Sequence, residues 1–471
     1  MTGTTASTAD AGDALDEALL QEANAQTTPA SAEPAWASPR LAWFTLAMIG
    51  ITTVFGQFDR AVFYLLVTSI KRDLQFTDTQ MSLLMGLAYS GAYFMCGLPV
   101  ARLIDVGPRK YISAAALTTW SLGTTFCALS GTFMQLFFSR MVVGAGESVK
   151  GPSAVSMISD LFPREKTPRA FAFYNFCIQG GDALANVVGG LLLGFFAAMG
   201  AVTVPLLGTL SDWHLVFIMF GLPGVAWAFV FILLVKEPAR HGRKVKGSVP
   251  LKDVAHFLFK SPSGKVLVPI LVASAILQIE SVGIGSWRPA FYERTYGLTP
   301  AQFAPIIGTG NLILVPIGLL LGSWLNERMT RRGRYDTNMR ISLWSHILGL
   351  PIGLAGPLMP TFELALACSF TGLLLTVAAA PAQLAAMQVV TPNELRAQVN
   401  ALYMVTVGVL GSGVGPLVVA LMTDHLFQSE GDLRYAMVTA VAVAAPISLF
   451  LIWKTLKPYG ELYKAQVAQQ G

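Results

Sequence analysis

The chain has 471 residues, of which 54% are hydrophobic and only 13% are charged, whereas soluble domains carry about 25% charged residues. This composition excludes an ordinary soluble globular protein and predicts a polytopic membrane protein. The net charge of +5 requires no nucleic-acid partner, because Lys and Arg collect in the cytoplasmic loops of membrane proteins.

The first 40 residues contain neither Lys nor Arg before Arg40 and have no apolar core, so they predict a disordered cytoplasmic tail rather than a secretory signal. Apolar runs long enough to cross about 30 Å of hydrocarbon then recur along the chain. They predict twelve membrane spans, at 42–69, 80–104, 111–130, 133–160, 169–197, 213–235, 263–290, 302–326, 339–358, 361–389, 397–423 and 435–454.

A charged segment rich in Gly, Ser and Pro at 236–262 divides the spans into six and six. We interpret it as a cytoplasmic linker between two six-helix bundles, at 41–235 and 263–456, followed by a cytoplasmic tail at 457–471. The fold class predicted is therefore all-α and integral to the membrane.

The distribution of basic residues predicts the orientation of the spans. With both termini in the cytoplasm, the basic runs within 240–246 and 328–334 stay inside, as the positive-inside rule requires. Few basic residues then lie outside, namely Lys71, Arg72, Arg288, Arg294 and Arg434.

The fourth span carries three charged residues, Arg140, Glu147 and Lys150, inside an otherwise apolar stretch. Charged groups at bilayer depth are costly and survive where they face one another or a water-filled pathway. Arg140 and Glu147 lie seven residues apart, which places them on nearly one helix face, and Lys150 follows one turn later. The spacing predicts a ladder of charges that lines a cavity.

At a rise of about 1.5 Å per residue, the charged residues of other spans fall into the same central slab of the membrane. Asp59 is a second candidate proton site or a partner of a nearby Arg. Lys150 either neutralises Glu147 or offers a cation to an anionic ligand, and polar residues elsewhere either contact substrate or join helices. The candidate substrate contacts are Arg60, Lys150, Asp182, Glu280, Tyr174 and Asn311.

Two loops in corresponding positions of the halves carry an acid followed four and five residues later by two bases. They contain Asp105, Arg109 and Lys110 after the second span, and Glu327, Arg331 and Arg332 after the eighth. Because they lie beyond the apolar runs, we predict that they lock cytoplasmic loops. Parallel six-span repeats are a known transporter design, with substrate bound between the halves near the midplane.

The loop at 101–110 resembles the Gly-x-Leu-x-Asp-Arg-x-Gly-Arg-Arg signature of the major facilitator superfamily, with three of its residues replaced. The segments at 58–60 and 159–163, and Arg140 followed by Gly-Ala-Gly-Glu at 144–147, resemble the spinster-like branch of that superfamily. The resemblance implies the twelve-helix major facilitator fold and alternating access.

In the spinster-like branch the acids and the Arg at these positions are associated with proton coupling, which the resemblance implies for Asp59, Arg140 and Glu147. Lys150 lies outside the branch pattern, and together with the arginines it favours an anionic ligand. We therefore predict a proton-coupled transporter that imports an organic anion, an aromatic or amphipathic carboxylate, by symport. We expect it to act as a monomer among membrane lipids of the bacterial inner membrane.

Three alternatives stay open. Within transport, the spinster-like resemblance also implies an exporter of lysolipid or sphingoid-like amphiphiles. A sensor that keeps the transporter fold but has lost transport belongs to another functional class. A membrane enzyme has little support, because the five His and four Cys residues show no catalytic or metal-ligand spacing. No cofactor and no metal are expected.

Overall fold

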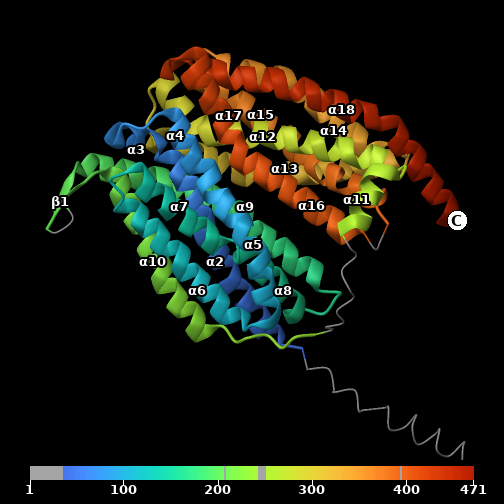
Figure 1. Cartoon of the computed structure of the whole chain (residues 1–471), viewed down its shortest axis with the longest axis horizontal. Helices are drawn as coiled ribbons and strands as arrows, with labels where there is room; N and C mark the ends of the chain where they lie inside the picture. Colours follow the sequence, from blue (N-terminus) through green and yellow to red (C-terminus); the bar gives the residue numbers. More distant parts are fainter. Residues whose placement is uncertain (1–35, 206–207, 242–250, 393–394, 471) are drawn as a thin grey trace, which may run out of the picture.

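The computed structural model describes residues 36–205, 208–241, 251–392 and 395–470. These residues form a helical protein with one short β-hairpin (Figure 1). The predicted tail at 1–40 lies almost entirely outside the described residues, as does the middle of the predicted linker.

The first half of the chain supplies six helical spans, and three of them are single uninterrupted helices. The third is α6 (Arg109–Ala128), the fifth is α9 (Thr167–Met199) and the sixth is α10 (Asp212–Leu234). The others are composite: α2 (Pro39–Leu65) with α3 (Val67–Leu74); α4 (Asp78–Leu83) with the π-helix η1 (Leu84–Ala88) and α5 (Tyr89–Val106); and α7 (Phe133–Glu147) with α8 (Lys150–Leu161).

A hairpin of two antiparallel strands, β1 (Val202–Val204) and β2 (Gly208–Leu210), separates α9 from α10, with Val202 opposite Leu210. The predicted linker contains a short helix, α11 (Leu251–Lys260), that leads into the second half.

The second half repeats the six-span arrangement. Its first four spans are α12 (Gly264–Tyr296), α13 (Pro300–Thr330), α14 (Thr337–Ala355) with η2 (Gly356–Leu358), and α15 (Phe362–Val389). The fifth span is composite and consists of α16 (Arg396–Gly408), η3 (Val409–Val414), α17 (Gly415–Leu421) and η4 (Met422–Phe427). The short η5 (Glu430–Asp432) precedes the sixth span, α18 (Leu433–Gln470). Helix α18 continues through nearly all of the predicted tail at 457–471.

Ten helical segments of the described chain are long and apolar enough to cross a membrane. The third and fourth spans fall short of this measure, because α6 is rich in Thr and Ser and the fourth span is broken between Glu147 and Lys150. Ser148 and Val149 lie at this break, so two short helices replace one long one. The twelve predicted spans all correspond to helical segments, and the all-α membrane fold is confirmed.

The two halves pack tightly together at the end of the molecule that carries α3, α4 and the β-hairpin, here called the hairpin end (Figure 1). A hydrophobic core at this end draws on both halves and includes Phe63, Leu66, Phe291 and Tyr292. Glycines allow close helix contact: a Cβ on Gly308 of α13 would lie 2.4 Å from the Ala183 carbonyl oxygen of α9.

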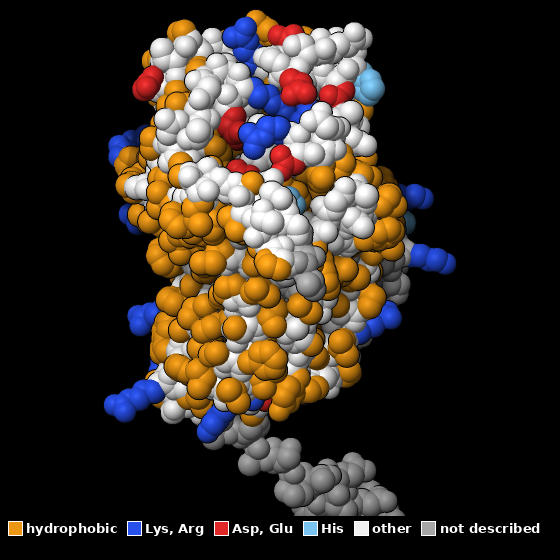
Figure 2. Space-filling view, turned by 90° about the vertical axis from the view of Figure 1, so that its left-hand side faces the viewer, with side chains coloured by type: hydrophobic (Ala, Val, Ile, Leu, Met, Phe, Trp, Pro, Cys, Tyr) orange, Lys and Arg blue, Asp and Glu red, His pale blue; other side chains and the backbone are white. Residues whose placement is uncertain are grey.

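The opposite end, where Trp36 and Gln470 lie, is here called the tail end. There the side chains of Leu98 and Val106 on α5 are 80% and 76% exposed. Figure 2 shows the molecule from the left-hand side of Figure 1: hydrophobic side chains cover the middle and lower part of this face, and acidic and basic side chains gather in its upper part. Such a belt is the surface that a bilayer would cover.

Candidate functional site

The break in the fourth span places Glu147 at the end of α7 and Lys150 at the start of α8. Lys150 Nζ lies 2.7 Å from Glu147 Oε2, and their side chains are 13% and 1% exposed. The Tyr89 hydroxyl donates a second hydrogen bond to the same carboxylate oxygen at 3.0 Å. Lys150 therefore contacts Glu147, as one of its two predicted roles requires, and a role towards the ligand stays a prediction.

Arg140 lies close to this pair without bonding to it. Its guanidinium packs over the rings of Phe63 and Tyr89, at 4.3 and 5.2 Å from the ring centroids, an arrangement that favours a buried cation. The Nε atom lies 3.4 Å from the Leu84 carbonyl oxygen, and Nη2 has no hydrogen-bond partner among the described residues. Tyr89 thus contacts Arg140 through its ring and Glu147 through its hydroxyl.

Asp59 joins this cluster from α2. Its side chain is buried and accepts a hydrogen bond of 2.5 Å from the Thr124 hydroxyl of α6. Its carboxylate interacts electrostatically with Glu147, Arg140 and Lys150. The three residues that the family resemblance associates with proton coupling therefore lie in one buried cluster of the first half.

A cavity of about 350 Å³, here called the central cavity, lies between the two halves and receives side chains from α2, α9, α12, α13 and η3. Most of its lining is polar, and three of the six predicted substrate contacts belong to it. The polar lining consists of Arg60, Tyr64, Asp182, Asn186, Gln278, Ser281, Ser286, Arg288, Asn311 and Ser412.

Neighbouring amides hold Arg60 at the wall of the central cavity. Its Nη2 donates to Gln57 Oε1 at 3.0 Å, and Gln57 Nε2 in turn donates to the Ile178 carbonyl of α9 at 3.0 Å. Asp182 interacts electrostatically with Arg60. The cavity wall on the side of the first half is therefore a charged and hydrogen-bonded surface.

Arg288 is a cavity residue that the sequence prediction missed. The prediction placed it outside the membrane near the end of a span at 263–290, whereas α12 extends to Tyr296 and Arg288 lines the central cavity. One signal was present in the sequence. Successive separations of three, four and three residues place a set of side chains on one helix face, and this set is Gln278, Ser281, Gly285 and Arg288.

The other predicted substrate contacts lie elsewhere. Tyr174 is buried in a hydrophobic cluster that includes Met48 and Met157. Lys150 borders a small cavity inside the first half, and Glu280 lines a separate cavity of about 200 Å³ inside the second half. Helix rotation explains these differences, because residues at equal depth can face different sides of a bundle.

The predicted gating loop of the first half is bound to its own half. Arg109 is fully buried; its Nε donates to Glu237 at 2.9 Å, and its Nη1 pairs with Asp160. The Lys110 backbone N–H donates to Glu237 at 2.7 Å, and the Asp105 carbonyl accepts from Arg240.

The corresponding loop of the second half is more exposed. Glu327 and Arg331 form an exposed i,i+4 ion pair, and Arg332 follows at the end of α13. A locking role for both loops remains a prediction.

A buried ion-pair cluster that the sequence did not reveal joins the halves at the hairpin end. Asp78 of α4 is 0% exposed, and Arg294 of α12 donates to both of its oxygens at 2.7 and 2.8 Å. Lys71 donates to Asp78 at 2.5 Å and lies 2.8 Å from Glu430 of the second half. Nearby, Thr79 donates to Asp424.

Comparisons with known proteins agree with this architecture. A family model described as Major Facilitator Superfamily matches residues 49–416. The chain is 25% identical over 429 residues to an MFS-type efflux pump of Mycolicibacterium smegmatis, covering 88% of this chain and 92% of the pump. It is 22% identical over 316 residues to a D-galactonate transporter of Escherichia coli, covering 62% of this chain and 69% of the transporter.

Among solved structures, a bacterial homologue of the human lysosomal transporter Spinster, in an inward-facing and unoccupied conformation, matches with a TM-score of 0.72 at 22% identity. The match covers 91% of this chain and 98% of that chain, and it agrees with the spinster-like motifs. Since the family model spans most of the sequence, the chain belongs to the major facilitator superfamily and is a membrane transporter rather than an enzyme.

Proposed function

We propose that the protein is a proton-coupled secondary transporter that takes up an organic anion by symport and alternating access. The observation that carries the proposal is the pair Arg60 and Arg288, which come from opposite halves and line the same cavity. Guanidinium groups bind carboxylates through charge-assisted, often bidentate hydrogen bonds. A carboxylate bound between them would link the two halves that alternating access moves apart.

The remaining lining supports a polar anion. Amide and hydroxyl groups of Asn186, Gln278, Asn311 and Ser412 surround the arginines, and such groups suit a hydroxylated substrate. The similar D-galactonate transporter is named for a hydroxylated carboxylate. An aromatic carboxylate has one aromatic side chain available in this lining, that of Tyr64.

Proton coupling is assigned to Asp59, Arg140 and Glu147. In the present arrangement Glu147 is held by Lys150 and Tyr89, while Nη2 of Arg140 has no hydrogen-bond partner in the part of the chain that the structure describes. A carboxylate binds its proton less readily when a second cation approaches it. A movement that separates Glu147 from Lys150 would permit proton uptake, and the approach of Arg140 or the return of Lys150 would release that proton.

The test is uptake into proteoliposomes with an imposed pH gradient, using a panel of D-galactonate, phenylacetate and a lysophospholipid. We expect the wild type to accumulate an anion when the gradient is present. Glu147→Gln, which cannot exchange a proton at this site, is expected to lose about tenfold or more of gradient-driven uptake while retaining exchange of substrate across the membrane.

Glu363→Gln is a matched control, because Glu363 is an exposed acid at the start of α15. It should transport as the wild type does. Full gradient-driven uptake by Glu147→Gln would contradict the coupling role, and failure to move any compound would favour the transport-inactive sensor.

Export of an amphiphile is a second candidate, favoured by the similarity to an efflux pump over most of both chains. The same vesicles distinguish the two directions. Movement of the lysophospholipid alone, with no movement of either carboxylate, would replace the anion proposal by this one.

A further inference from the structure

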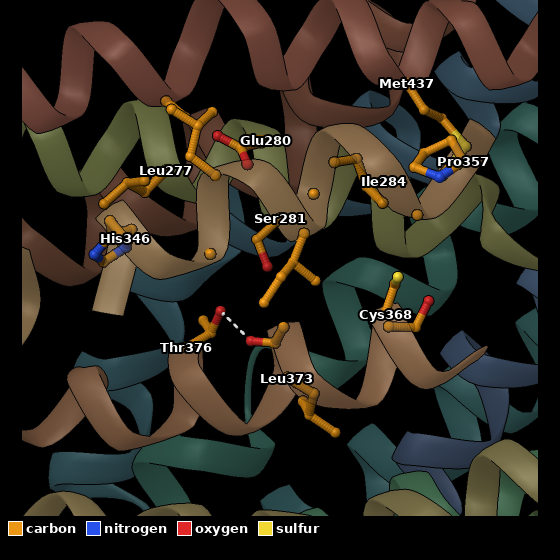
Figure 3. A pocket seen from close by; sticks show the side chains of 18 of the residues that line it. Leu277, Glu280, Ser281, Ile284, His346, Pro357, Cys368, Leu373, Thr376 and Met437 are labelled. Carbon is orange, nitrogen blue, oxygen red and sulfur yellow. Dashed lines mark hydrogen bonds between the residues drawn. The ribbon is translucent and has the colours of Figure 1, made fainter. Parts of the chain in front are cut away.

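The cavity inside the second half lies among α12, α14, α15 and α18. Figure 3 shows Glu280, Ser281 and Ile284 of α12 on one side, Cys368, Leu373 and Thr376 of α15 on the other, and His346 of α14 at one end. Its volume of about 200 Å³ is large enough for a small polar group.

This cavity adjoins the central cavity, because Ser281 and Arg288 line both. A ligand bound by Arg288 in the central cavity therefore lies next to the wall of the smaller cavity. We name the smaller space the side cavity.

The side cavity presents an unsatisfied acid. Glu280 Oε2 is buried and has no hydrogen-bond partner among the described residues. The described residues also place no Lys, Arg or His within salt-bridge distance of this carboxylate. A buried polar atom without a partner is costly, and more so when it is charged, so Glu280 is poised to accept from a ligand or to hold a proton.

His346 adds a second acceptor. Its Nδ1 lies 2.6 Å from the Ser342 carbonyl oxygen, and because a carbonyl only accepts, Nδ1 must carry the hydrogen. The neutral imidazole then presents Nε2 as an acceptor. Thr376 uses its hydroxyl hydrogen on the Gly372 carbonyl at 2.9 Å, the dashed line in Figure 3, so this oxygen also offers lone pairs.

We propose that the side cavity binds the ammonium group of an amino-carboxylate substrate, whose carboxylate is bound by Arg60 and Arg288 in the central cavity. An ammonium has three donors and no acceptor, which matches the surplus of acceptors on Glu280, His346 and Thr376. The acid of the central cavity, Asp182, already interacts with Arg60, whereas no described cation lies within salt-bridge distance of Glu280, so the ammonium is assigned to the side cavity. This inference rests on the anion transport proposed above and narrows its substrate class.

The competing account is that Glu280 simply carries a proton. A protonated Glu280 would need no cation from the ligand, and its replacement would then alter transport of all anions alike. Two compounds that differ by one amino group separate the accounts.

The test measures binding of D-gluconate and of D-glucosaminate, its 2-amino analogue, to purified full-length protein by isothermal titration calorimetry. For the wild type we expect D-glucosaminate to bind at least about tenfold more tightly, which corresponds to about 1.4 kcal/mol. Glu280→Gln should reduce this ratio to about one and leave the affinity for D-gluconate within about twofold. Glu363→Gln, an exposed acid of the same half, should leave the ratio at its wild-type value.

His346→Leu gives an independent measurement if Glu280→Gln does not fold. It removes one acceptor and leaves the carboxylate, so the ratio should fall about threefold.

Equal affinities in the wild type, or a ratio that neither variant changes, would overturn the ammonium site while anion transport stands. Loss of gradient-driven uptake of both compounds alike in Glu280→Gln, with the binding ratio retained, would assign Glu280 to proton transfer instead. If neither compound binds and no anion is transported, both proposals fail.

Discussion

Lys150 and Glu147 form a buried ion pair at the break between α7 and α8. The pair needs space on the facing helix, and Gly56 of α2 provides it: a Cβ at this position would lie 2.3 Å from Lys150 Nζ. Removing one partner of a buried pair leaves an uncompensated charge, which costs about 3–5 kcal/mol unless the remaining group is neutralised.

Lys150→Met is therefore expected to lower the thermal unfolding midpoint of the detergent-purified protein and to reduce gradient-driven uptake by about tenfold. The order in which the carboxylates of the uptake panel are preferred should not change, because Lys150 lies outside the central cavity. The double variant Lys150→Met/Glu147→Gln should recover much of the lost stability, since no unpaired carboxylate remains.

Lys166→Met tests whether loss of any positive charge has the same effect, because Lys166 is exposed. The Lys166→Met variant should have the thermal unfolding midpoint of the wild type. A changed substrate order in Lys150→Met would show that Lys150 contacts the ligand after all.

At the scale of helices, glycines determine how closely the charged residues approach one another. A Cβ on Gly144 of α7 would lie 2.1 Å from the Tyr89 carbonyl oxygen of α5, far inside van der Waals contact. This close approach of α7 to α5 lets the Tyr89 hydroxyl reach Glu147.

Gly144→Ala should therefore destabilise the protein by about 1–3 kcal/mol, the usual cost of overpacking, and weaken proton coupling by displacing Tyr89. Gly91→Ala is the matched control on α5, because a Cβ there would meet nothing within 4 Å. Thermal unfolding followed by tryptophan fluorescence compares the two, and an equal effect of both variants would contradict the packing argument.

Irregular helix segments meet at the interface between the halves. The π-helices η1 and η3 face each other there, and a Cβ on Gly86 would lie 2.6 Å from the Gly413 carbonyl oxygen. Single π-turns are frequent at functional sites, and here they occupy the contact that alternating access has to open.

For the whole molecule, the cluster around Asp78 closes the hairpin end through ion pairs between the halves. Truncating one partner of a buried, hydrogen-bonded charge pair typically costs about 2–5 kcal/mol. Asp78→Asn should therefore shift the population towards conformations that are open at the hairpin end.

Accessibility of the central cavity measures this shift. In a background in which the four native cysteines are replaced, Ser412→Cys places a thiol in the cavity lining. A membrane-impermeant maleimide applied from the hairpin side should label this thiol at least about threefold faster when Asp78→Asn is present. Glu363→Gln, which removes an exposed acid of the second half, is the control, and identical labelling rates in both would rule out the lock.

The sequence analysis predicted that Asp59, Arg140 and Glu147 lie close together, and they do. Their depths follow from their positions in apolar runs, and a family motif contains all three. The sequence analysis did not identify Tyr89 as the side chain between Arg140 and Glu147. An intramembrane Tyr is more often a packing residue than a ligand, and nothing in its own sequence neighbourhood distinguishes it.

The sequence by itself determined the twelve spans, the division into two halves and the central depth of Asp59, Arg140 and Glu147, because these depend on composition and on the rise per residue. Only the tertiary structure decided which charges meet: Lys150 with Glu147, Arg60 with Arg288 at one cavity, and Asp78 with Arg294 across the halves. Partner choice depends on helix rotation and on close approach at glycines, and these are set by contacts between residues far apart in the sequence.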